Sequence, residues 1–113
     1  MELTVEDLGH GCCLRLAGRL DSPGVDVVET RFLAAANQGR GAVLVDLSSV
    51  SFVSSMGIRM LIAAAKTLHA RNLRLVVFGA RPLVRELFDT VALDQILPLA
   101  ADESEALQMA ARP

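Results

Sequence analysis

The chain has 113 residues, of which 52% are hydrophobic and 4% aromatic, and its formal net charge is −2. This length predicts one domain, residues 1–113, with an aliphatic core. The weakly acidic balance and the lack of Trp and Tyr argue against a nucleic acid partner. The first ten residues carry neither a basic region nor an apolar core, and no apolar run could span a bilayer. We therefore expect a cytoplasmic protein without direct membrane binding.

The first part of the chain predicts a β-hairpin. Apolar and polar residues alternate over 3–6 and 12–16, and the segment 7–11, which contains two glycines, joins them. Cys12 and Cys13 are adjacent in the second run, so on a strand their side chains point to opposite faces. A disulfide between them would need a strained ring, and we expect two buried free thiols.

A helix is expected after this hairpin. Residues 18–21 should leave the sheet, after which Ser22 is suited to cap a helix and Pro23 to its first position. The apolar residues that follow have the 3-4-3 spacing of one buried helix face, at Val25, Val28, Phe32 and Ala35. The glycines of the segment 37–41 predict the end of this helix.

The centre of the chain predicts a strand, a serine-rich joint and a second helix. Residues 42–47 are apolar on both faces except at Asp46, which favours a central parallel strand. The joint follows over 48–57. The helix over 56–70 should turn Arg59, Lys66 and Thr67 outward, and its buried face should comprise Ile58, Leu61, Ile62, Ala65 and Leu68.

The last third predicts three shorter pieces of structure. Residues 73–78 form an apolar strand, and Pro82 begins a helix with Val84, Leu87 and Phe88 inward. Residues 96–99 suit an edge strand, because Pro98 cannot donate a hydrogen bond in a central one. Residues 102–105 read as a capping box before a helix with Ala106, Leu107 and Ala110. The predicted core comprises Leu14, Leu16, Val43, Val45, Ile62, Leu75, Val77 and Leu87.

The serine-rich joint is the candidate functional site. Either Ser54 or Ser55 can cap the following helix, but one cap accounts for only one of the five serines between 48 and 55. Gly57 would allow close backbone approach by a partner or ligand. Met56 is either an adaptable recognition residue or a partly buried staple beneath the joint. A helix N-terminus also favours an anion, including a phosphate attached to serine.

The joint lacks the groups that catalysis or a cofactor would require. It contains no histidine, no set of metal ligands and no phosphate-loop lysine, so we expect neither an enzyme nor a bound cofactor. Asp21 and Asp46 are expected at strand ends that face the same side of the sheet. We expect the Asp21 loop, residues 51–56 and Arg59 to form one contiguous recognition surface.

The motifs of this chain resemble those of a known family. The segments 18–21, 45–48 and 52–57 resemble the STAS domain of bacterial anti-sigma factor antagonists, and the resemblance continues through 74–77, 82–85 and 93–96. It implies a single STAS-like α/β domain, in which helices pack against a mixed sheet of four to five strands.

The resemblance also implies a function in partner switching, which controls transcription. Members of the family bind an anti-sigma factor that is a serine kinase; phosphorylation of a serine at the helix head breaks the complex, and a phosphatase restores it. The serine of this chain that matches the modified one is Ser55. Ser54 stands where the family usually has an aspartate, and Met56 stands where it has a second hydroxyl residue. Ser54 is therefore the alternative site of phosphorylation. The implied partner-binding residues are Asp21, Ser51, Val53, Ser54, Ser55, Met56, Gly57 and Arg59.

Two other functions remain open at the level of sequence. In the first, the domain senses a small ligand, and Asp21, Asp46 and the helix head bind a nucleotide. In the second, it is a cytosolic accessory subunit of a membrane transporter and binds a protein partner.

Overall fold

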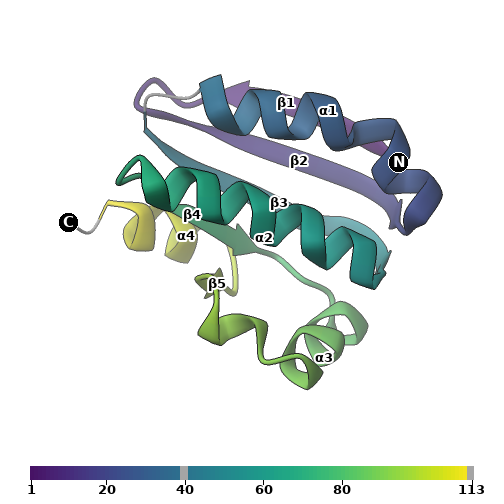
Figure 1. The fold of residues 1–113 in the computed structure, drawn as a ribbon. Helices are drawn as coiled ribbons and strands as arrows, with labels where there is room; N and C mark the ends of the chain where they lie inside the picture. Colours follow the sequence, from purple (N-terminus) through teal and green to yellow (C-terminus); the bar gives the residue numbers. More distant parts are fainter. Residues whose placement is uncertain (39–40, 112–113) are drawn as a thin grey trace.

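A computed structural model describes residues 1–38 and 41–111, which form a single α/β unit around one five-stranded sheet (Figure 1). The strands lie in chain order; β1 is antiparallel to β2, and the other neighbouring strands are parallel. The predicted mixed sheet is therefore confirmed. The elements are β1 (Glu2–Asp7), β2 (Gly11–Leu20), α1 (Ser22–Gln38), β3 (Ala42–Val53), α2 (Ser55–Ala70), β4 (Leu75–Phe78), α3 (Pro82–Thr90), the 3-10 helix η1 (Leu93–Gln95), β5 (Leu99–Ala100) and α4 (Glu103–Ala110).

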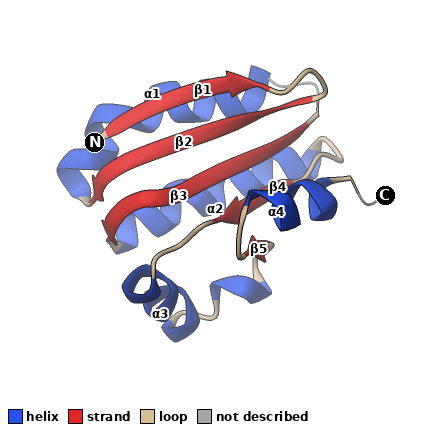
Figure 2. Cartoon of the chain, turned by 180° about the vertical axis from the view of Figure 1, so that it is seen from behind, coloured by secondary structure: helices blue, strands red, loops and turns tan. Residues whose placement is uncertain are grey.

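The helices divide unequally between the two faces of the sheet. Helices α1 and α2 lie side by side on one face, whereas α4 lies on the other (Figures 1 and 2). The larger core forms under α1, α2 and α3, where Phe32, Leu61 and Phe88 are fully buried. A smaller core forms under α4 around Cys13, Leu44, Val76, Phe78, Ala100 and Ala106. The adjacent thiols are free and buried and belong to different cores, as predicted.

Arg15 on β2 forms ion pairs that connect α4 to the face of the sheet on which this helix packs. Its guanidinium group lies 2.8 Å from the carboxylate of Asp46 on β3 and 2.9 Å from that of Glu103 on α4. A third carboxylate, that of Glu6 on β1, lies 3.1 Å away. Burial alone would raise the pKa of Asp46, but hydrogen bonds from Ser48 and Arg15 outweigh it and hold that pKa below its ordinary value.

Two strands extend further than the sequence predicted. Residues 18–20 do not leave the sheet, since β2 continues to Leu20, and the joint up to Val53 is the second half of β3. Helices cover only one face of this half of the sheet. Val50 and Val53 are therefore buried while Ser48, Ser49 and Ser51 are exposed. A strand with small polar residues on its open face resembles a loop in composition.

Smaller corrections concern strand lengths and helix faces. Strand β4 begins only at Leu75, and the predicted edge strand is shortened to two residues after Pro98. The glycine end of α1 at Gly39 lies outside the described residues. On α2, Met60 and Ala64 are buried although they were not predicted to be. On α1 the buried residue is Ala36 and not the predicted Ala35. Four residues predicted to be buried are only partly buried: Ile58, Ile62, Ala65 and Leu87. Leu107 on α4 is 45% exposed.

The predicted hairpin, the start of the third helix and the capping of the last helix are confirmed. The hairpin pairs Leu3 with Leu16 across β1 and β2, and α3 begins at Pro82. Asp102 caps α4, where its Oδ1 accepts a hydrogen bond from the amide of Glu105 at 2.9 Å. The Glu105 carboxylate in return accepts a hydrogen bond from the amide of Ala101 at 3.3 Å, one residue before the cap. This is a variant of the predicted capping box.

Candidate regulatory site at the head of α2

Ser54 is the capping residue of α2. Its backbone is extended, with φ −90° and ψ 174°, and its Oγ accepts a hydrogen bond from the amide of Gly57 at 3.4 Å. The same hydroxyl donates to the carbonyl oxygen of Leu20 at 3.2 Å, and the Ser54 amide donates to that oxygen at 2.9 Å. Ser54 therefore connects the end of β2 to the start of α2, and its side chain already has two partners inside the domain.

Gly57 brings the first turn of α2 against β2. A Cβ at this position would lie 2.7 Å from the carbonyl oxygen of Leu20, so the close approach requires a glycine. The approaching group belongs to the chain itself, which corrects the expectation that a partner or ligand would approach here. Gly57 is buried, so it shapes the head of α2 from below.

Three exposed side chains lie on the outer side of the first two turns of α2. Ser55 is the first residue of α2, and within the described part of the chain its hydroxyl makes no hydrogen bond. Met56 is 39% exposed, which favours the recognition residue over the buried staple. Arg59 is exposed one turn after Ser55, and residues four apart are neighbours on a helix surface.

Asp21 caps the neighbouring helix α1. Its Oδ1 accepts a hydrogen bond from the amide of Gly24 at 3.0 Å, so Asp21, and not the predicted Ser22, fills the capping position. This hydrogen bond is the main reason why the pKa of Asp21 lies below its ordinary value, and Arg19, whose Nε lies 3.3 Å from Oδ2, adds to the effect. The sequence places two capping residues side by side, and only the geometry distinguishes them.

Near the ends of β2 and β3, beside this site, lie Arg19 and Phe52, which the sequence did not single out as site residues. The guanidinium carbon of Arg19 lies 4.7 Å from the centre of the Phe52 ring, at a cation–π distance. Ser51, the residue before Phe52, is exposed, and its Oγ donates to the carbonyl of Gly18 at 3.4 Å. Val53 is only 2% exposed, so it supports this surface without being part of it. The pairing of Arg19 with Phe52 across parallel strands appears only once the register is known.

Asp46 does not belong to this site. It pairs with Arg15 in the register of β2 and β3, whereas Asp21 follows Leu20, which pairs with Val53 at the far end of the same strands. Val53 lies seven positions after Asp46 on β3, or roughly 23 Å at 3.3 Å per residue. The two aspartates therefore do not converge as the nucleotide alternative requires, because β3 continues from Asp46 to Val53.

Residues 1–38 and 41–111 offer neither a metal site nor a membrane-spanning helix. They contain no group of three or more His, Cys, Asp or Glu side chains able to hold a metal ion. None of their helices is long and apolar enough to cross a membrane.

Comparison with known proteins identifies the family. The model of a family described as "Mlab, STAS domain" matches residues 3–99. The "Putative anti-sigma factor antagonist BtrV" of Bordetella bronchiseptica is 28% identical over 106 residues, covering 94% of this chain and 91% of that protein. The anti-sigma-B factor antagonist of Listeria monocytogenes serovar 1/2a is 35% identical over 106 residues, covering 93% and 91%. The chain belongs to the STAS domain family, among the anti-sigma factor antagonists.

Solved structures have the same fold. An anti-sigma factor antagonist from Mycobacterium paratuberculosis superposes with a TM-score of 0.89 at 24% identity, covering 98% of this chain and 94% of that one. The Bacillus cell fate determinant SpoIIAA in its phosphorylated form superposes with a TM-score of 0.70 at 22% identity, covering 96% and 98%. The sheet and helices described above are thus those of a STAS domain.

Proposed function

We propose that this protein is a cytoplasmic, non-enzymatic binding switch whose affinity for an anti-sigma factor with serine kinase activity is controlled by phosphorylation of Ser55. In the unmodified state the head of α2 binds the partner and frees the sigma factor. Phosphorylation dissociates the complex, and a serine phosphatase returns the chain to its binding state. A chain of the same fold, SpoIIAA, is known in a phosphorylated form, which supports such a modification.

The contrast between two adjacent serines is the observation that supports Ser55 most strongly. The Ser54 hydroxyl is engaged by Gly57 and Leu20 inside the domain, so a kinase could reach it only by breaking the cap of α2. The Ser55 hydroxyl is exposed on the same turn. A kinase could modify Ser55 without disturbing the fold.

The domain can tolerate the added charge. A phosphate on Ser55 adds roughly −1.5 to −2 charges at neutral pH, at the end of α2 where free backbone amides favour an anion. Arg59 lies one turn further along the same exposed face and can form an ion pair with it. We therefore expect little change in the stability of the domain.

The interface cannot tolerate the charge equally well. Unmodified Ser55 lies beside Met56, an exposed apolar residue suited to the centre of a contact. A phosphate there would have to lose its water or face partner groups that were arranged for a neutral hydroxyl. A penalty of about 2.8 kcal/mol weakens binding roughly a hundredfold. The switch would then act by blocking a contact, without a large conformational change.

Phosphopeptide mass spectrometry after incubation with the cognate kinase tests the site directly. We expect phosphate on Ser55 in the unmodified chain and in Ser54→Ala, and none in Ser55→Ala. Phosphate on Ser54 alone would move the assignment by one residue. A chain that the kinase leaves unmodified at both serines would refute the phosphorylation switch.

Binding of the partner tests the consequence of the charge. Ser55→Asp should abolish binding with near-normal stability, and Ser55→Ala should bind but resist release by the kinase. Ser104→Asp is the matched control, because Ser104 is also an exposed serine in the first turn of a helix but lies on α4, on the opposite face of the sheet. Equal loss of binding in both aspartate variants would point to general electrostatic repulsion.

A further inference from the structure

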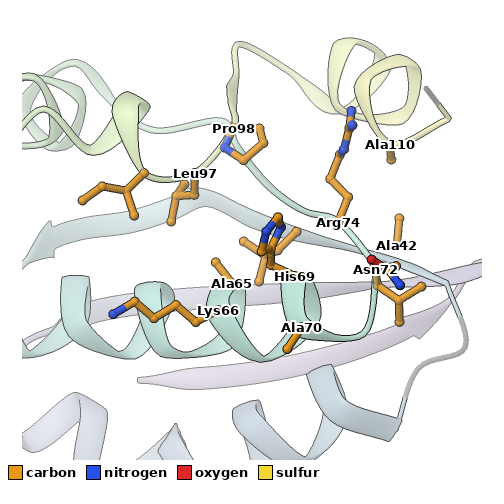
Figure 3. Close-up of a pocket in the computed structure, with 13 residues that line it drawn as sticks. Ala42, Ala65, Lys66, His69, Ala70, Asn72, Arg74, Leu97, Pro98 and Ala110 are labelled. Carbon is orange, nitrogen blue, oxygen red and sulfur yellow. The ribbon is translucent and has the colours of Figure 1, made fainter. Parts of the chain in front are cut away.

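A second concave site lies at the other end of α2. A cavity of about 740 Å³ opens between the last turns of α2, the start of β4, the segment before β5 and the end of α4 (Figure 3). Its volume lies within the range of small-molecule binding sites. His69 on the cavity wall lies fourteen positions after Ser55 on α2, or roughly 21 Å at 1.5 Å per residue. The cavity is thus distinct from the site at the head of the helix.

The ionisable side chains that line this cavity are all basic. Among the described residues, Lys66 and His69 on α2 and Arg74 before β4 line it, and no Asp or Glu does. Figure 3 shows the His69 ring rising from α2 between Pro98 and Arg74. The Arg74 guanidinium donates one hydrogen bond to the carbonyl of Met109 at 2.8 Å, which positions it and leaves further N–H groups for a ligand.

The rest of the wall is mostly apolar. Ile96, which is 53% exposed, lies on it with Leu97 and Pro98. A large aliphatic side chain exposed beside a cavity gains from contact with an apolar ligand. The other apolar lining residues are Ala42, Ala65, Ala70, Leu73, Leu75 and Ala110.

Two carbonyl groups at the end of α2 beside the cavity already have donors. The carbonyl groups at the end of a helix carry partial negative charge when they lack donors. Here the Leu68 carbonyl accepts from the amides of Arg71 and Leu73 at 3.0 and 2.8 Å, and the His69 carbonyl accepts from the amide of Asn72 at 3.0 Å. The turn after α2 therefore occupies these acceptors.

We propose that this cavity binds a small amphipathic anion, an aliphatic chain that ends in one carboxylate or phosphate group. The chain lies along Ile96 and Leu97, and the head lies between His69 and Arg74. The Lys66 side chain points away from Arg74, toward the Leu97 end of the cavity (Figure 3). Basic side chains and an apolar wall complement such a ligand, whereas a neutral or cationic amphiphile would satisfy only the wall. The site is independent of the proposed phosphorylation of Ser55.

The single lysine of the chain supplies a local probe. Reductive methylation with carbon-13 labels Lys66 and the amino group of Met1 and keeps their charges. Titration with octanoate or octyl phosphate should shift the Lys66 signal saturably and leave the Met1 signal unchanged. Acetate tests the head without the chain, and octanol and octylamine test the chain without the anion. The absence of a saturable Lys66 shift, or equal binding of octylamine, would overturn the proposal.

Variants test the contribution of charge on the unmethylated chain by backbone amide NMR. Lys66 and His69 are exposed, so the double variant Lys66→Gln/His69→Gln should fold normally. It should weaken octanoate binding roughly twofold to thirtyfold, because two exposed basic groups near the anion are lost. Arg31→Gln, which removes an exposed charge from α1, is the matched control and should leave the affinity unchanged. An unchanged affinity in the double variant would refute the assignment of the anionic head.

Discussion

The account of the two adjacent serines predicts a defined cost for Ser54→Ala. The substitution removes the hydrogen bond that the Gly57 amide donates to Ser54 Oγ and leaves that amide without its capping partner. The carbonyl of Leu20 keeps one donor, because the backbone amide at position 54 still lies 2.9 Å away. The expected loss is therefore that of one helix cap, about 1 kcal/mol. With an unfolding entropy of about 2.1 cal/mol/K per residue, this lowers Tm by about 4 °C.

Chemical denaturation of the unmodified chain, Ser54→Ala and Ser104→Ala measures this loss. Ser104 is an exposed serine one residue inside α4 and is not its cap, so its replacement should change stability by less than about 0.5 kcal/mol. Ser54→Ala should nonetheless remain a substrate for the kinase. A loss for Ser54→Ala no larger than the control's would mean that the cap contributes nothing to stability. Loss of phosphorylation in a folded Ser54→Ala chain would contradict the division of roles between the two serines.

Three further predictions concern the scaffold. Leu75→Ala should cost about 2–5 kcal/mol in urea denaturation because Leu75 is 2% exposed, and a loss below about 0.5 kcal/mol would contradict its place in the core. Gly57→Ala should cost about 1–2 kcal/mol in the same assay, since overpacking against Leu20 outweighs the better helix propensity; a gain would refute the close approach. Because the pKa of Asp46 is lower in the folded than in the unfolded chain, its ionised carboxylate stabilises the fold above about pH 4. This stabilisation is lost as the pH falls through the lowered pKa of the folded state. Arg15→Gln should therefore flatten the decline of the unfolding free energy between about pH 5 and 3, and an unchanged slope would contradict the pairing.

The parts of the fold that the sequence predicts are those whose residues are constrained on both sides. Residues 43–47 are buried by helices on one face and by α4 and its neighbours on the other, so their apolar run, interrupted only by Asp46, identifies a central strand. The second half of β3 is covered on one face only. Ser48, Ser49 and Ser51 occupy its open face, and their composition is that of a loop. Strand pairing across the sheet, which no local pattern encodes, extends β3 to Val53.

The candidate site was predictable in its location but not in the roles of its residues. Serines before a helix indicate a cap and an accessible hydroxyl, and Ser54 and Ser55 serve these two purposes separately. The contact of Gly57 with Leu20 decides which serine faces inward, and that contact joins residues far apart in the chain. The placement of Asp46 away from Asp21 follows from the length of β3 in the same way. The pairing of residues far apart in the chain therefore decides which serine caps α2 and where Asp46 lies. Residue types and their spacing do not determine either.

A phosphate on Ser55 is expected to abolish binding of the anti-sigma factor without unfolding the domain. Titration of one anti-sigma factor preparation with the unmodified chain and with the chain phosphorylated on Ser55 gives the ratio of the two dissociation constants. The account predicts that phosphorylation raises Kd by roughly a hundredfold or more while Tm changes little. Equal Kd values for the two forms, or a loss of binding accompanied by unfolding, would contradict it.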